Sequence, residues 1–112
     1  MAFTLTSETT NGIAKIEMTG ELDASVANQL KSAVEKAAAD KAKRLVLMVS
    51  ELSYMASAGL RGLVFAKQKM GSGVEIFIVG AQESVAETIE MTGFQNSVVM
   101  LPSYDVATIE AA

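Results

Sequence analysis

The chain has 112 residues, of which half are hydrophobic and a fifth are charged, so residues 1–112 are long enough for one compact domain and too short for two. The formal net charge of −4, without a large Lys/Arg cluster, disfavours nucleic acid and anionic membranes as partners. The absence of cysteine and histidine excludes a disulfide framework, a Cys/His metal site, a Ser-His-Asp triad and an imidazole base. We therefore expect no enzyme activity, no metal and no cofactor.

The N-terminal residues 1–5 do not combine a basic region with a following apolar stretch, as a secretory leader would. No uncharged apolar run approaches the length needed to span a bilayer. We therefore expect a cytoplasmic protein, and we take an acidic monomer as its default state.

The first 40 residues predict a β-hairpin followed by a helix. Residues 3–6 and 13–18 are strand-like, and Asn11-Gly12 between them favours the positive φ angles of a tight turn. Asp23 is a good N-cap for a helix that extends to about Ala39. One face of this helix is apolar, at Val26, Leu30, Ala33, Val34 and Ala37.

Two further strand–helix units and a last strand follow. The predicted elements are a strand at 44–49, a helix at 58–70, a strand at 74–79, a helix at 82–92, a strand at 97–101 and a short helix after Ser103. Helices that alternate with short apolar strands predict an α/β fold. We expect a mixed, mostly parallel sheet with an N-terminal hairpin and about four helices.

Ser57 lies where the apolar strand gives way to the next helix, which is the position of an N-cap. A phosphate on this serine would place negative charge against the positive end of the helix dipole. From the residues alone, a structural N-cap without any regulatory role is the favoured interpretation. The nearby hydroxyl-bearing residues Ser53 and Tyr54 are assigned to the strand–helix loop.

Several other residue groups receive structural interpretations. The methionines at strand and helix positions are expected to fill the core: Met55, Met70, Met91 and Met100. The carboxylates Glu21, Asp23, Glu51 and Glu75 come from separate elements, and no spacing makes them converge on a metal. The segment Gly71-Ser72-Gly73 lacks the lysine and the glycine spacing of a phosphate-binding loop, so it is predicted to be a turn.

Three tetrapeptides occur in a fixed order: Gly20-Glu21-Leu22-Asp23, Ser57-Ala58-Gly59-Leu60 and Met91-Thr92-Gly93-Phe94. With the order of elements, they resemble a STAS domain of the anti-sigma factor antagonist family over essentially the whole chain. The resemblance implies a partner-switching protein without catalytic activity. Its unmodified form would bind an anti-sigma factor that is also a serine protein kinase of histidine-kinase-like ATPase fold. Phosphorylation would release it, and a PP2C-type phosphatase would reset it.

The chain departs from the family pattern at two positions. Many antagonists carry the phosphorylated residue directly before the glycine, where this chain has Ala58. Other STAS proteins carry Ser-Ala-Gly-Leu, and the resemblance to them makes Ser57 the phosphorylation site. Ser50 stands where an acidic residue commonly closes the strand, which leaves the local charge around the site open.

The resemblance also predicts a partner-binding surface on the loop after the second strand, the serine loop and the exposed side of the following helix. Its expected residues are Asp23, Ser57, Ala58, Gly59, Arg61, Phe65 and Gln68. Asp23 would act as a helix cap, alone or together with partner contacts. Gly59 would admit a closely approaching partner or neighbouring strand, or would only ease the helix start.

Two other classes of function stay open at this point. One is a non-switching STAS scaffold or regulatory subunit of a transporter or stress-sensing complex, in which alanine at position 58 would be unremarkable. The other is an enzyme or nucleotide-hydrolysing domain, which the absence of histidine, cysteine and a phosphate loop disfavours. The sequence does not identify the anti-sigma partner, or decide whether the output is a sigma factor.

Overall fold

The computed structural model describes residues 2–71 and 73–110 and contains one five-stranded sheet of order β1-β2-β3-β4-β5. The strands are β1 (Thr4–Thr10), β2 (Ile13–Leu22), β3 (Arg44–Met55), β4 (Glu75–Val79) and β5 (Val99–Leu101). The helices are α1 (Ala27–Ala39), α2 (Ser57–Met70), α3 (Glu83–Met91) and α4 (Val106–Glu110), with a 3-10 turn, η1 (Phe94–Ser97). β1 is antiparallel to β2, and the remaining neighbours are parallel. The predicted mixed α/β fold is confirmed.

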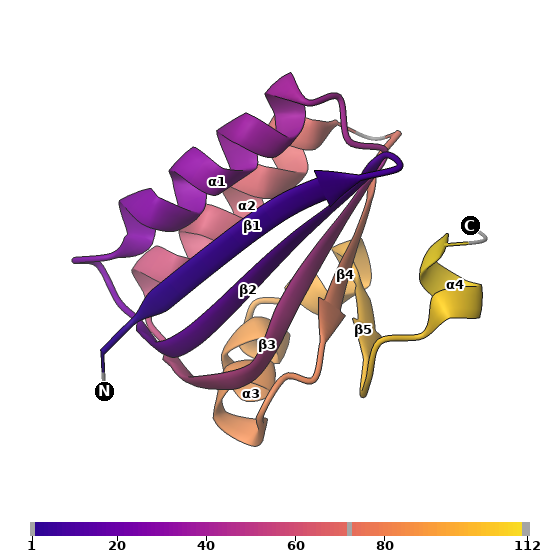
Figure 1. Cartoon of the computed structure of the whole chain (residues 1–112). Helices are drawn as coiled ribbons and strands as arrows, with labels where there is room; N and C mark the ends of the chain where they lie inside the picture. Colours follow the sequence, from indigo (N-terminus) through magenta and orange to yellow (C-terminus); the bar gives the residue numbers. More distant parts are fainter. Residues whose placement is uncertain (1, 72, 111–112) are drawn as a thin grey trace.

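The helices cover the two faces of the sheet unequally (Figure 1). α1, α2 and α3 bury their apolar sides in the main core on one face, together with Leu45, Leu47 and Ile76 from the sheet. Among the described residues, α4 is the one helix on the opposite face, where it packs through Ile109. Ile109 joins a smaller cluster with Val46, Phe77 and Val79. No described helix covers this face over β1 and β2.

The predicted hairpin forms, and its turn has the expected geometry. Asn11 and Gly12 have φ angles of 54° and 79°, the left-handed values that a two-residue turn between twisted strands requires. β1 and β2 then pair in unbroken register from Thr10↔Ile13 to Thr4↔Thr19.

β2 and β3 are longer than the sequence predicts, because β2 continues past Met18 to Leu22 and β3 continues past its apolar run to Met55. Exposed residues break the apolar pattern in these distal halves, and the pairing shifts register between Glu17 and Thr19. Pairing with the neighbouring strand nevertheless keeps both segments extended. The assignment of Ser53 and Tyr54 to a loop was therefore wrong, since both belong to β3.

Two further predictions need correction near the C-terminus. Met91 is 86% exposed, because α3 turns Val85 and Ile89 inward and its last residue lies on the opposite side. Met55 is buried as predicted, while Met70 and Met100 are partly buried against the core.

Residue 97 ends the 3-10 turn instead of beginning the last strand, which starts at Val99. Ser72 of the predicted glycine turn lies outside the described residues.

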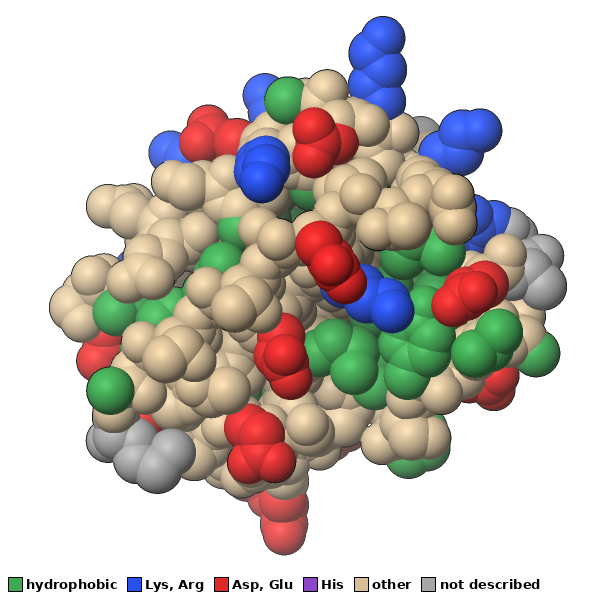
Figure 2. Space-filling model, viewed as in Figure 1, with side chains coloured by type: hydrophobic (Ala, Val, Ile, Leu, Met, Phe, Trp, Pro, Cys, Tyr) green, Lys and Arg blue, Asp and Glu red, His purple; other side chains and the backbone are tan. Residues whose placement is uncertain are grey.

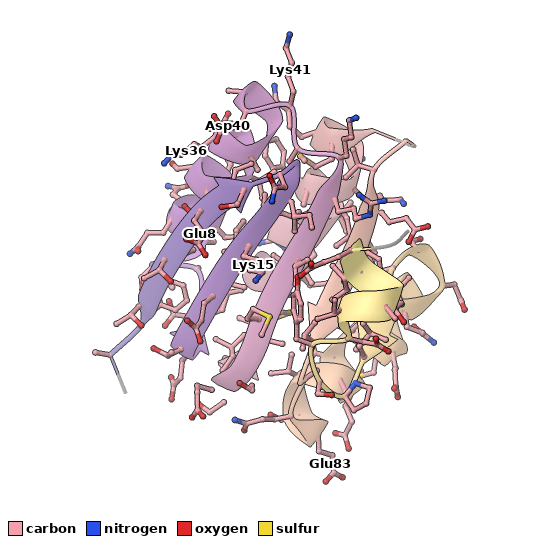
Figure 3. All side chains as sticks on the ribbon, turned by 45° about the vertical axis from the view of Figure 1, so that its right-hand side comes forward. Glu8, Lys15, Lys36, Asp40, Lys41 and Glu83 are labelled. Carbon is pink, nitrogen blue, oxygen red and sulfur yellow. The ribbon has the colours of Figure 1, made fainter. Side chains whose placement is uncertain are left out.

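The face of β1 and β2 without a helix, here called the open face, carries charged groups beside α4 (Figure 2). Figure 3 shows Lys15 and Glu8 on neighbouring strands of this face. The Lys15 ammonium lies 4.4 Å from the centre of the Tyr104 ring, and the Tyr104 hydroxyl donates to Glu110 Oε2 at 2.8 Å. Burial and then the Glu110 carboxylate raise the pKa of Tyr104 to about 12. The Lys15 contact joins the C-terminal segment to the sheet, and the Tyr104–Glu110 bond closes that segment on itself.

Candidate functional site

The carboxyl ends of β2 and β3 lie side by side and bring two of the predicted site segments together. Leu22 is paired with Met55, and the backbone N–H of Ala56 donates to the Leu22 carbonyl at 2.9 Å. Asp23 directly follows Leu22, and Ser57 directly follows Ala56. Because both strands are parallel, both chain segments leave the sheet at the same edge. We call this region the β2–β3 end.

Ser57 is the first residue of α2, and its predicted role as N-cap was wrong. The N-cap is Ala56, whose extended backbone (φ −78°, ψ 168°) continues the strand and whose carbonyl accepts the first helical hydrogen bond, from Leu60 at 3.1 Å. The N–H groups of Ser57, Ala58 and Gly59 therefore have no hydrogen-bond acceptor within the helix. No acidic residue lies in this first turn, so the positive end of the helix dipole is not offset locally.

The hydroxyl of Ser57 is exposed, and no hydrogen bond engages it within the described part of the chain. The hydroxyls of nearby serines, in contrast, form hydrogen bonds within the protein. The Ser53 hydroxyl donates to the Gly20 carbonyl at 3.1 Å, and the Ser84 hydroxyl of α3 donates to the Ser53 carbonyl at 2.8 Å. These two bonds tie β3 to β2 and to α3, which fixes the strand end that carries Ser57.

Gly59 is required because the neighbouring strand approaches it closely. A Cβ at this position would lie 2.8 Å from Cγ of Leu22 and 3.1 Å from the Leu22 carbonyl oxygen. Contacts below 3.0 Å force atoms to move, so only glycine lets the start of α2 rest on the end of β2. Among the three roles left open by the sequence, the structure supports close approach of the neighbouring strand.

Asp23 does not cap α1, which begins four residues later with Val26 at its N-cap. Its Oδ1 accepts hydrogen bonds from the backbone N–H of Ser25 at 2.9 Å and from the Ser25 hydroxyl at 2.6 Å. The Asp23 carbonyl accepts from the Val26 N–H at 3.2 Å, which closes a turn before the helix. The bond from the Ser25 side chain lowers the pKa of Asp23, so this side chain is an ionised part of the turn.

The remaining predicted residues lie along α2. Ala58 is half-buried, Arg61 and Gln68 are exposed, and Phe65 is half-buried against the main core. Arg61 follows Ser57 by four residues, so both side chains project from the same side of the helix. The predicted surface therefore combines two exposed polar side chains with one aromatic ring at the seam to α1.

Sequence reasoning did not find Lys31, whose ammonium lies 5.3 Å from the centre of the Phe65 ring. Lys31 comes from α1, and no local spacing relates it to Phe65. Val64, an exposed apolar residue of α2, was also missed, although its position in the helix next to Phe65 could have indicated it.

The described residues contain no group of three Asp, Glu, Cys or His side chains that could hold a metal ion. Within the same residues, no helix combines the length and the apolar character that crossing a membrane requires. What the β2–β3 end offers chemically is an accessible hydroxyl beside free backbone donors, on a rigid helix start.

Comparison with known proteins assigns the fold to a family. The STAS domain family model matches residues 4–107, and the chain therefore belongs to the STAS domain family. A curated relative is the anti-sigma-F factor antagonist RsfB of Mycobacterium tuberculosis, which is 27% identical over 96 residues, covering 86% of this chain and 79% of the relative.

Solved structures agree with this assignment. An anti-sigma factor antagonist from Mycobacterium paratuberculosis superposes with a TM-score of 0.85 at 25% identity, over 96% of this chain and 92% of its own. The phosphorylated form of the Bacillus cell fate determinant SpoIIAA superposes with a TM-score of 0.71 at 18% identity, over 98% of both chains, which demonstrates a shared fold.

Proposed function

We propose that this chain is an anti-sigma factor antagonist that changes partners through phosphorylation of Ser57. In this proposal the unmodified protein binds, in the cytoplasm, an anti-sigma factor that is also a serine kinase of histidine-kinase-like ATPase fold. Phosphorylation releases the antagonist, and a PP2C-type phosphatase restores it. The chain itself has no catalytic activity, because the transfer and removal of phosphate belong to its partners.

The observation that carries the proposal is the exposed hydroxyl of Ser57 at the first position of α2, which forms no hydrogen bond within the described residues. A kinase needs to reach the acceptor oxygen without unfolding the segment that presents it. The nearby Ser53 hydroxyl fails this requirement because it is bonded to the Gly20 carbonyl at 3.1 Å. The curated relative RsfB, whose name is anti-sigma-F factor antagonist, supports the class of partner.

The charge that phosphate adds explains how one residue would reverse partner choice. A phosphoserine carries about −1.5 to −2 charges at neutral pH. In the free protein, the helix N-terminus and Arg61, one turn further on, would stabilise this charge. Within an interface the same phosphate would be desolvated or would face partner groups suited to a neutral hydroxyl. Each loss of about 1.4 kcal/mol lowers the affinity tenfold.

We further propose that the partner contacts Asp23, Ser57 and Ala58 at the β2–β3 end, and Arg61, Phe65 and Gln68 along α2. Gly59 contributes by allowing the two segments to lie together, since its missing side chain admits Leu22. A surface of this composition combines charged and polar side chains with an aromatic ring, as many protein interfaces do.

The test is capture of partners from a lysate of the source bacterium by the native chain, Ser57→Ala and Ser57→Asp, with identification by mass spectrometry. We expect the native and Ser57→Ala chains to retain a protein with a histidine-kinase-like ATPase domain, and Ser57→Asp to lose it. Ser103→Asp is the matched control, because it adds the same charge at an exposed position in the C-terminal segment. The captured kinase, supplied with ATP, should then phosphorylate the native chain and not Ser57→Ala.

Equal capture by all variants would contradict the switch. If that common set consists of transporter or stress-complex subunits, the chain is a non-switching STAS scaffold, and Ser57 only begins a helix.

A further inference from the structure

The two edges of the sheet differ in how well they are protected against pairing with another strand. β5 has three residues, and Pro102 directly after it has no N–H to donate. β1 has seven residues and pairs with β2 in unbroken register, without a bulge, proline or lysine. A long, regular edge strand without such features is a template for an additional strand. Among the elements that the structure describes, none lies beside β1 in the plane of the sheet (Figure 1).

The register identifies which backbone groups of β1 point away from the sheet. The Gly12 carbonyl faces β3, because it accepts from the N–H of Arg44, the first residue of β3, at 3.2 Å, so the groups of the next residue, Ile13, face β1. Thr10, paired with Ile13, therefore bonds to β2, and so do alternate residues back along the strand. The residues whose N–H and C=O groups point outward are Leu5, Ser7 and Thr9. Within the described residues, no turn or loop hydrogen bond uses these groups.

A groove of about 470 Å³ runs beside this edge, between β1 and α1. It is lined by Leu5, Ser7, Asn28, Gln29, Ser32, Ala33 and Lys36. Lys36, labelled in Figure 3, is the one charged residue among them, so an added strand meets mostly uncharged side chains in the groove.

We propose that β1 pairs antiparallel with β1 of a second copy of this chain, about a two-fold axis at Ser7, so that the two sheets become one. This arrangement is isologous and closes after two copies. It forms about six backbone hydrogen bonds from the outward groups of the two strands. This proposal differs from the monomer expected from the sequence, and the oligomeric state distinguishes the two.

The strand sequence is self-complementary in this register. Ser7 lies opposite Ser7, and Leu5 lies opposite Thr9, on the side of the groove. Thr6 lies opposite Glu8 on the open face. Glu8 is the only charged residue of β1, and its cross-strand neighbour on β2 is Lys15. In the dimer each Glu8 lies opposite Thr6 of the other copy, whose hydroxyl can donate to the carboxylate, and the two Glu8 side chains are diagonal neighbours, each beside its own Lys15. The pairing of each carboxylate with a hydroxyl donor favours a second copy as the occupant of the edge.

The dimer leaves the β2–β3 end free, because β1 occupies the sheet edge and Ser57 follows β3, which is separated from β1 by β2. Each dimer would present a Ser57 on both halves. The pairing does not depend on phosphorylation or on any function of Ser57, so its test is independent of the proposed function.

Sedimentation equilibrium of the native chain from about 1 µM to about 1 mM tests the proposal. We expect a reversible monomer–dimer equilibrium. Ser7→Pro removes the central outward N–H and no bond to β2, so this variant should stay folded by circular dichroism while its dimer dissociation constant rises at least about tenfold. Ser7→Ala, which keeps the backbone N–H, should dimerise like the native chain. A native chain that stays monomeric throughout, or a folded Ser7→Pro that dimerises normally, overturns the proposal.

Cysteine cross-linking tests the register, because the native chain has no cysteine. In the proposed dimer the two Ser7 Cα atoms lie about 5.5 Å apart, within disulfide range, while the two Thr9 Cα atoms lie about 14 Å apart. Mild oxidation should convert Ser7→Cys, and not Thr9→Cys, into a covalent dimer. Efficient cross-linking of Thr9→Cys instead would overturn the two-fold axis at Ser7.

Discussion

The segments that follow β2 and β3 leave the sheet at the same edge but are built differently. After β2, the Asp23 carboxylate closes a turn by accepting two hydrogen bonds from Ser25, and α1 begins only at Ala27. After β3, one extended residue leads directly into α2, and the first side chain of the helix, Ser57, is exposed and unengaged within the described residues. A polar side chain that completes its own turn serves the fold. A polar side chain with no such task, on an equally rigid support, is available for chemistry.

The largest effect is expected where the two segments touch. Gly59→Val would drive a branched side chain into Leu22, whose Cγ lies 2.8 Å from even a Cβ at position 59. Overpacking of this kind costs about 1–3 kcal/mol, and we expect a loss of about 2 kcal/mol in the free energy of unfolding by urea. Gly73→Val is the control, because a Cβ there meets no atom within 4 Å. Equal destabilisation by both variants would show that Leu22 and Gly59 do not join the segments.

The next effect separates binding from stability. Ser57→Asp should weaken binding to the captured anti-sigma partner at least about tenfold in titration calorimetry. The same variant should be as stable as the native chain or up to about 1 kcal/mol more stable, because a carboxylate in the first turn of α2 interacts favourably with the helix dipole. Ser57→Ala should bind like the native chain. A loss of binding that accompanies a loss of stability would mean that the residue is structural.

A smaller effect is expected on the other segment. Asp23→Ala removes the acceptor of both Ser25 hydrogen bonds, so the midpoint of urea unfolding should fall, although less than in Gly59→Val. Asp23→Asn keeps an acceptor oxygen, so its urea midpoint should fall less than that of Asp23→Ala. If neither variant changes the midpoint, the turn does not depend on its carboxylate, and the contrast between the segments disappears.

The smallest effect concerns pH. The folded-state pKa of Asp23 lies below its ordinary value of 3.8, because the Ser25 side chain donates to the ionised form. Its stabilising contribution is therefore fully present above that ordinary value and is lost as the pH falls through the lower folded-state pKa. The hydrogen bond from the Thr108 backbone N–H lowers the pKa of Asp105. The stabilising contribution of Asp105 is therefore also lost as the pH falls. Urea midpoints measured from pH about 6 to pH about 2 should fall less steeply in Asp23→Asn than in the native chain.

Much of the fold could be predicted because its elements have strong local signals. The Asn11-Gly12 turn, the apolar runs of β3 and β4 and the helical spacing of Leu30, Val34 and Ala37 are properties of neighbouring residues. The cap predictions failed for a non-local reason. Pairing between the distal halves of β2 and β3 keeps the chain extended to Ala56, so the start of α2 is determined by the neighbouring strand and not by the best capping residue.

The candidate site likewise combines features that local sequence determines with features that depend on tertiary packing. The sequence by itself determined that one α/β domain forms, that it resembles the STAS family, and that a small hydroxyl residue stands between a buried strand and a helix, because alternating and helical apolar periods and short motifs are local properties. Only the tertiary structure decided that Gly59 admits Leu22, that Asp23 is engaged by Ser25 while Ser57 is exposed, and that β1 is a long, unprotected edge. These features depend on which strands pair and how closely the helices approach them, and sequence periodicity does not contain that information.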